Sequence, residues 1–271
     1  MTSPPPCRRT RGATLVEALA ALGIAALLLA ATQRLIVLAT RQDAELRRRL
    51  TARRAAVAVA AVLRAELELL DAAAGDLVAA TESTVVLRAV RGAGYACGVR
   101  PGAIIVADSL WSPVRAADPA RDSVLVWLEG DPPWTPAGGW VAAALSGVGG
   151  AACDDGSPGL RLDVAGADPR LGAAAALAPV RTFEIVEYRA YPDAARTWWL
   201  GIRTRAGATW AATSPVAGPL APRGLTLRLL DAGGAAVVAP GSAVAVELEI
   251  RGMIGRYVDS LRTVIAMRPP R

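Results

Sequence analysis

The residue types that carry out most enzymatic proton transfer and covalent chemistry are missing from this chain. Its 271 residues include no histidine, no lysine and no asparagine. Without histidine there is no imidazole acid–base catalyst, no histidine metal ligand and no Ser-His triad. Without lysine there is neither a Schiff base nor the lysine of a phosphate-binding loop. The composition therefore argues against an enzyme, and we expect no catalytic residues, no cofactor and no metal site.

One acidic residue has an unusual position near the N-terminus. Glu17 is followed by an uncharged, mostly apolar run that lasts until Arg34. A carboxylate at bilayer depth costs roughly 2.5–3.5 kcal/mol, so an acid at the start of such a run needs a function. We therefore treat Glu17 as a candidate functional residue.

The elements that must position Glu17 are a short leader and one long helix. Residues 1–12 hold three prolines and three arginines. Residues 13–33 would be about 31 Å long as a helix, which is enough to span a bilayer. Leu63, Leu67 and Leu70 then recur at helical spacing, and no proline or glycine occurs between Ile24 and Ala74. We expect a transmembrane helix at 13–33 and an amphipathic stalk helix at 34–74.

From residue 75 onwards the sequence is typical of β-structure. At 243–250, four aliphatic residues alternate with alanine or glutamate. The predicted strands are 84–90, 103–107, 123–129, 159–164, 182–190, 197–204, 208–213, 224–230, 243–251 and 261–268. Two segments, 108–122 and 130–158, are predicted to be long loops. The second of them is rich in proline and glycine, which favour turns and loops. The pattern predicts an α+β fold with a β-rich head at 75–271.

The positive charge is concentrated in the predicted stalk. Residues 34–64 carry eight arginines and two acids, whereas residues 65–271 carry 19 arginines and 21 acids. The basic character therefore does not belong to the head, and we expect no nucleic-acid partner for the head. A basic stalk next to a membrane could contact anionic lipid or acidic neighbouring subunits.

The segment around Glu17 reads Gly12-Ala13-Thr14-Leu15-Val16-Glu17-Ala18-Leu19. This segment resembles the processing motif of type IV pilins and type II secretion pseudopilins. In that family a prepilin peptidase cuts after the glycine on the cytoplasmic side and methylates the new N-terminus, and glutamate is the fifth residue of the mature chain. The resemblance implies processing at Gly12 and Ala13 and an assembly role for Glu17. Ala13 stands where the family usually has phenylalanine.

The C-terminal part of the head is similar to W-type minor pilins and J-type minor pseudopilins. The similarity covers about residues 182–268, and residues 76–181 contribute nothing to it. It rests on the order of Glu187-Tyr188-Arg189-Ala190-Tyr191, Thr197-Trp198-Trp199-Leu200, Gly218-Pro219-Leu220-Ala221-Pro222-Arg223-Gly224-Leu225, Asp231-Ala232-Gly233-Gly234 and Thr263-Val264-Ile265-Ala266-Met267-Arg268. This likeness implies a head of pilin type, with the long helix packed on an antiparallel sheet.

Together these likenesses imply a minor pilin or pseudopilin with a cleaved leader at 1–12. Such a subunit is inserted once in the inner membrane, with the leader cytoplasmic and the head at 75–271 periplasmic. It is then built into a type IV pilus or a type II secretion pseudopilus, in an initiation or tip complex. The expected partners are prepilin peptidase, the inner membrane, and other minor and major pilins or pseudopilins through the N-terminal helix. A secreted substrate or surface ligand is a further expected contact of the head.

Two other interpretations of the N-terminus remain open. Residues 1–31 could be an ordinary secretory signal peptide. Alternatively, the helix could be a plain single-pass anchor for a periplasmic binding module or enzyme, in which case Glu17 has no special role. The distribution of arginines also conflicts with the orientation of the pilin interpretation. Three arginines precede the span and six lie between Arg41 and Arg54, so the positive-inside rule alone would keep the stalk cytoplasmic.

The chain has three cysteines, Cys7, Cys97 and Cys153. Cys7 lies in the leader and would leave when the leader is cut. The remaining pair would be outside the cytoplasm, where disulfides persist. We therefore expect a disulfide between Cys97 and Cys153, the alternative being two unpaired buried thiols.

Overall fold

The structure is a computed structural model that describes residues 14–129, 138–166, 170–171 and 177–268. Its contacts divide the chain into two units, residues 1–48 and residues 49–271. In the described residues, the first unit is helical and the second holds all of the strands.

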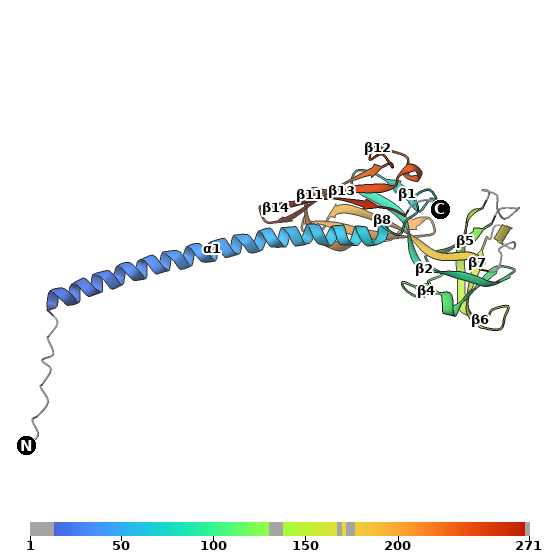
Figure 1. The fold of residues 1–271 in the computed structure, drawn as a ribbon, viewed down its shortest axis with the longest axis horizontal. Coiled ribbons are helices and arrows are strands. Elements are labelled where there is room, and N and C mark those ends of the chain that lie inside the picture. The colour runs from blue at the N-terminus through green and yellow to red at the C-terminus, as the bar shows by residue number, and fades with distance from the viewer. Residues whose placement is uncertain (1–13, 130–137, 167–169, 172–176, 269–271) are drawn as a thin grey trace, which may run out of the picture. The chain divides into compact units, whose positions relative to one another are not determined.

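Helix α1 spans Leu15–Leu67 and consists largely of alanine and leucine, which both favour helices. Up to residue 48 almost every position is exposed. From Ala52 onwards, buried positions recur at spacings of three and four along one stripe of the helix: Ala52, Ala55, Ala56, Val59, Ala60, Leu63 and Leu67. This stripe packs against the sheet (Figure 1). The C-terminal part of α1 is therefore amphipathic, as the sequence predicts.

The helix ends at Leu67, so the predicted stalk helix at 34–74 is wrong in its last turns. Two aspartates hold the following residues in turns instead. Asp71 Oδ1 accepts a hydrogen bond from the N–H of Ala74 at 3.1 Å, and Asp76 Oδ2 accepts one from the N–H of Asp71 at 3.0 Å. Aspartate side chains compete in this way with helical backbone bonds. Leu70 is fully buried, so its helical spacing reflects burial rather than a helix.

The stripe of α1 covers a sheet that we call the helix-backed sheet. Its strands, all antiparallel to their neighbours, follow the order β1 (Leu77–Ala80), β2 (Thr84–Arg100), β8 (Pro179–Pro192), β9 (Trp198–Ala206), β11 (Ser214–Leu230), β13 (Ala245–Ile254) and β14 (Tyr257–Ala266). Short strands β10 (Thr209–Trp210) and β12 (Ala236–Val237) pair with β9 and β11. One hydrophobic core joins this sheet to α1. A long apolar helix packed on a large antiparallel sheet confirms the predicted α+β class.

Strands β2 and β8 continue beyond this sheet into a second group of strands. There the pairing runs from β2 through β3 (Ala103–Ala107), β7 (Pro158–Ala165), β6 (Gly139–Ala152) and β5 (Asp122–Leu128) to β8, which pairs with β2. These six strands form a closed circuit of pairing that we call the strand ring. The ring has its own hydrophobic core, with Ile104, Val126 and Leu162 among its buried residues. Closing the circuit removes free edges from this part of the sheet.

Strand β6 contradicts the prediction of a long loop at 130–158. Residues 139–152 form a strand of 14 residues, although they include four glycines. Because glycine has a low β-propensity, the composition of this segment does not indicate a strand. It forms because β5 pairs with one side of its backbone and β7 with the other. The segment 108–122 fits the prediction better, since it holds only the 3₁₀ turn Asp108–Leu110 and the two-residue strand β4 (Ser112–Pro113) before β5.

Most of the remaining predicted strands are present at about the predicted positions, but their lengths differ from the prediction. The predicted strand 103–107 is confirmed with the same bounds as β3. Strands β2 and β8 extend well past the predicted 84–90 and 182–190, because they serve both groups of strands. The predicted strand 208–213 shrinks to the two residues of β10. Strand β1 was not predicted, and a 3₁₀ turn at Pro240–Ser242 precedes β13.

Candidate functional site

Glu17 lies in the first turn of α1, where it takes part in a reciprocal hydrogen-bonding arrangement with Thr14. Glu17 Oε2 accepts a hydrogen bond from the N–H of Thr14 at 2.9 Å, and Thr14 Oγ1 accepts one from the N–H of Glu17 at 3.3 Å. This is the capping box of the sequence pattern Thr-x-x-Glu. Both side chains are exposed. A negative charge in the first turn is also favourable with respect to the helix dipole.

After Glu17, α1 presents an apolar surface on all sides. The exposed large apolar residues up to residue 38 are Leu15, Val16, Leu19, Leu22, Ile24, Leu27, Leu28, Leu29, Leu35, Ile36, Val37 and Leu38. A helix that is apolar all round must be buried in something, either a protein core or a membrane. Within the described residues, α1 is the one helix long and apolar enough to cross a membrane, and none of its most apolar window is buried by the chain itself.

The predicted processing residues Gly12 and Ala13 lie outside the described residues, as does Cys7. The predicted disulfide partners lie together, since Cys97 and Cys153 are bonded with their Cα atoms 5.2 Å apart. Cys97 belongs to β2, and Cys153 follows β6 directly. The bond therefore links β2 to the end of β6, a strand of the ring that is not a hydrogen-bonded neighbour of β2.

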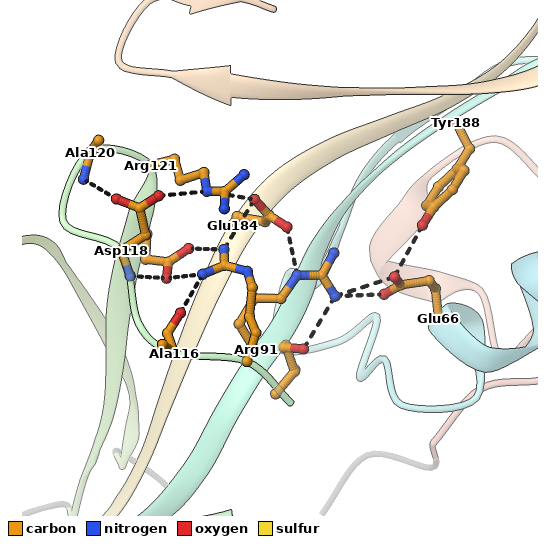
Figure 2. A network of polar contacts seen from close by, with 11 residues as sticks. Glu66, Arg91, Ala116, Asp118, Ala120, Arg121, Glu184 and Tyr188 are labelled. Carbon is orange, nitrogen blue, oxygen red and sulfur yellow. Dashed lines mark hydrogen bonds and ion pairs between the residues drawn. The ribbon is translucent and has the colours of Figure 1, made fainter. Parts of the chain in front are cut away.

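A buried ionic network lies where the end of α1 meets strands β2 and β8 (Figure 2). Its central cation is Arg91, which is 9% exposed. Arg91 Nε donates to Glu184 Oε1 at 2.6 Å, and Arg91 Nη1 donates to Glu66 Oε1 at 3.2 Å. Tyr188 Oη donates to the same Glu66 oxygen at 3.0 Å. One guanidinium thus ties α1 to both of the strands that continue into the ring.

The network continues into the segment before β5. Arg115 Nη1 donates to Asp122 Oδ2 at 2.9 Å, and Arg115 Nη2 lies 3.2 Å from Glu184 Oε2. Arg121 Nε lies 2.9 Å from Asp118 Oδ2. Arg91 therefore contacts one carboxylate oxygen of Glu184, and Arg115 contacts the other. The two arginines place positive charge beside a carboxylate that would otherwise be costly to bury, although Oε2 of Glu184 accepts no hydrogen bond from the described residues.

Arg91 reaches the network because β2 is irregular at this residue. The pairing of β2 with β8 shifts register between Val90 and Gly92, which leaves Arg91 as an extra residue. Such a bulge redirects the side chain and bends the strand. The bulge lies between the part of β2 in the helix-backed sheet and the part in the strand ring. Sequence patterns do not single out Arg91 or Glu184, because Arg91 directly follows the predicted strand 84–90 and Glu184 is one of several charged residues in the predicted strand 182–190.

The electrostatics of the network indicate a structural role for its titratable groups. Burial raises the pKa of Tyr188 well above its usual range, and Glu66 adds to this effect. Tyr188 is therefore a hydrogen-bond donor and not a base. Burial lowers the pKa of Arg91, but Glu66 and Glu184 outweigh burial and the net pKa is raised. The network holds α1, β2, β8 and the segment before β5 together.

No cluster of three or more potential metal ligands occurs within the residues that the structure describes. No protein-family model, curated protein or solved structure matches the chain.

Proposed function

We propose that the chain is a minor pilin or pseudopilin subunit that assembles into a filament through α1. The observation that carries this proposal is Glu17, a carboxylate in the first turn of a helix that is otherwise uncharged as far as Arg34. The surface of this part of the helix is apolar and exposed, as expected for a segment that packs in lipid and then among the helices of neighbouring subunits. The rest of the chain supplies a β-rich head.

Glu17 would act by pairing with the N-terminus of a neighbouring subunit. Cutting after Gly12 turns the nitrogen of Ala13 into an amine that carries a positive charge. A carboxylate in lipid is costly unless it finds such a charge. Docking of a second subunit, with its Ala13 amine next to Glu17, removes that cost and selects one register between the helices. Pairing therefore favours the assembled subunit over a single subunit that remains alone in the membrane.

In this proposal prepilin peptidase cuts the leader at the cytoplasmic face of the inner membrane and methylates Ala13. The helix from residue 13 then anchors the chain, and the head lies in the periplasm until the subunit enters a pilus or pseudopilus. Other minor and major pilins or pseudopilins contact it through α1, as part of an initiation or tip complex. The head could additionally contact a secreted substrate or a surface ligand.

The proposal is tested by the N-terminus of the mature protein. The chain is purified from membranes of its native host, and the mass of its N-terminal peptide is measured. We expect a mature chain that begins at Ala13. The same sample from cells that lack the peptidase should begin at residue 1. A mature start at Met1 in normal cells, or a cut after residue 31, would overturn the proposal in favour of a plain anchor or a signal peptide.

A further inference from the structure

Strand β14 forms a free edge of the helix-backed sheet. It pairs with β13 through ten consecutive residue pairs without a shift of register, from Ala245↔Ala266 to Ile254↔Tyr257. Among the described strands, β14 has no partner on its other side. The edge is therefore long and regular, which makes it a template for pairing with another strand.

The register identifies which backbone groups point away from the sheet. The N–H of Met267 donates to the C=O of Val244 at 2.9 Å, so the odd-numbered residues direct their backbone groups towards β13. Along an antiparallel strand, successive residues direct their N–H and C=O groups towards opposite sides of the strand. The N–H and C=O groups of Val258, Ser260, Arg262 and Val264 therefore point to the free edge, where the described backbone provides no partner.

The edge lacks the usual devices that prevent strand addition. Natural edge strands are commonly protected by proline, bulges or free charges. Residues 257–266 contain no proline and no lysine. The two charged side chains of β14 are engaged within the chain, since Asp259 Oδ2 lies 3.8 Å from Arg53 Nη1 and Arg262 Nη2 lies 2.6 Å from Glu247 Oε1. These ion pairs hold the charges on the two faces of the sheet.

Both sides of the edge also carry exposed apolar side chains. On the face away from the helix, Val258 and Val264 are each 53% exposed. On the helix side, Leu50 and Val57 are similarly exposed. Helical periodicity places Leu50 and Val57 on the same stripe of α1 as Arg53 and Arg64, which form polar contacts with Asp259 and Thr263 of β14. A strand added to β14 would therefore cover apolar side chains on both of its faces.

The direction of β14 argues against a second copy of this chain as the added strand. Arg53 contacts Asp259, Arg64 contacts Thr263, and the C=O of Leu70 accepts from the N–H of Arg268 at 2.8 Å. Strand β14 therefore runs in the same direction as the C-terminal part of α1. Antiparallel pairing of β14 with β14 of a second copy would make those two helical segments antiparallel. Neighbouring subunits in one filament need parallel helices, because both are inserted from the same membrane.

Strand β1, at the other edge of the sheet, is also unsuitable as the strand that a second copy would add to β14. Strand β1 lies six strands from β14 in an antiparallel sheet and so runs in the same direction as β14. If the helices of the two copies are parallel, β1 can pair with β14 only in the parallel orientation. Strand β1 is also only four residues long. It would leave most of the ten residues of β14 unpaired.

We propose that β14 accepts an extended strand from a different subunit of the same assembly, running antiparallel to β14 and carrying apolar side chains opposite Val258 and Val264. This inference rests on the proposed function, because the argument against a second copy assumes a shared membrane. Main-chain bonds to the outward-facing groups would provide affinity, and the side chains next to Val258, Val264, Leu50 and Val57 would provide specificity.

The first test uses a photo-crosslinking amino acid at position 258 or 264 of the full chain, expressed in its native host. After illumination, the crosslinked product is isolated from membranes and its peptides are identified by mass spectrometry. Both positions should link to one segment of one other subunit. Because the pairing is antiparallel, the residue linked from 264 should precede the residue linked from 258 by about six positions. A product with twice the mass of this chain, scattered linkage sites, or no product would each overturn the inference.

The second test compares Val264→Pro with Val264→Ala, each combined with the crosslinker at position 258. Proline removes the N–H that points to the free edge and leaves the bonds of β14 to β13 in place. We expect Val264→Pro to lower the crosslinking yield roughly tenfold, equivalent to about 1.4 kcal/mol, and Val264→Ala to change it little. Equal yields for the two variants would contradict strand addition. The crosslinks of the chain with Val264 intact do not depend on how well either variant folds.

The same samples separate this inference from the proposed function. The N-terminal mass shows whether the chain was cut after Gly12, whatever happens at β14. A chain that starts at Ala13 but gives no ordered crosslinks would overturn the edge inference alone. A chain that is uncut yet crosslinks in antiparallel order to a different subunit would overturn the filament proposal and leave the strand addition standing.

Discussion

The carboxylate of Glu17 has two roles that depend on different properties of the same group. In the structure its carboxylate accepts a hydrogen bond from the N–H of Thr14 and so caps the helix. In the proposed filament it pairs with the Ala13 amine of a neighbouring subunit. A cap needs an oxygen acceptor, whereas pairing needs a negative charge. Glutamine supplies the first without the second, so substitutions can separate the two roles.

We predict that Glu17→Ala and Glu17→Gln both remain in the membrane, are cut normally and fail to enter filaments. Removing the carboxylate makes the membrane segment more apolar, so insertion should not suffer. Glu17→Gln retains the cap and loses the charge, so it should fail as Glu17→Ala does. The measurement is the amount of each variant in sheared filaments relative to membranes.

Thr14→Ala is the matched control for these variants, because it removes the hydroxyl of the cap and retains the charge of Glu17. Loss of such a cap typically costs about 0.5–2 kcal/mol of helix stability, which neighbouring helices would offset in an assembly. Thr14→Ala should therefore enter filaments. If Glu17→Gln assembles normally and Thr14→Ala does not, capping is the function of this pair and the pairing mechanism is wrong.

At the level of secondary-structure elements, β2 and β8 link the two parts of the head. Each strand pairs within the helix-backed sheet and then within the strand ring. The bulge at Arg91 lies between these two parts of β2, and the ion pairs of Arg91 attach α1 and β8 at the same point. Removing this guanidinium would leave the half-buried Glu66 and the buried Glu184 with less compensating charge.

We predict that Arg91→Met lowers the free energy of unfolding by about 3–5 kcal/mol, as expected when one partner of a buried ion pair is removed. Arg100→Met is the control, since Arg100 pairs with Asp154 and both side chains are more than half exposed. Exposed pairs contribute about 0–1 kcal/mol. The measurement is urea unfolding of the full chain in detergent, followed by tryptophan fluorescence. Similar losses for the two variants would show that the network does not hold the elements together.

At the scale of the whole molecule, the disulfide constrains the part of the head that the sequence pattern described least well. Cys97 and Cys153 are separated by 56 positions, and the intervening chain includes β3, β5 and β6. In the chain-entropy account, closing a loop of this length stabilises the folded state by about 4 kcal/mol. The stabilisation comes from the unfolded chain, which loses conformational freedom.

We predict that replacing both cysteines, Cys97→Ser with Cys153→Ser, lowers the free energy of unfolding by about 4 kcal/mol. Alkylation of the unfolded protein without reductant gives an independent measurement. The mature chain should show no free thiol, whereas the uncut chain should show one, from Cys7. Two or more reactive thiols in the mature chain would mean that the disulfide is absent in the cell and that the head does not reside in an oxidising compartment.

Much of the architecture follows from the sequence because it depends on local patterns. The alanine- and leucine-rich N-terminal segment dictates a helix, and its exposed apolar surface follows from composition alone. Strands β3 and β13 have continuous or alternating aliphatic residues, so their positions are predictable to within a few residues. The motif around Glu17 is also readable without a structure, since the relevant information is the spacing of residues along one helix.

Other features depend on residues far apart in the chain, and local patterns cannot predict them. Strand β6 is rich in glycine and alanine and forms because β5 and β7 pair with it. The helix ends at Leu67 because Asp71 and Asp76 bind the following backbone while the sheet buries Leu70. The ring closes only when β2 meets β8, about 90 positions later in the chain. Tertiary structure likewise determined the Arg91 network and the free edge of β14, because both are defined by which strands are neighbours and which strand has none.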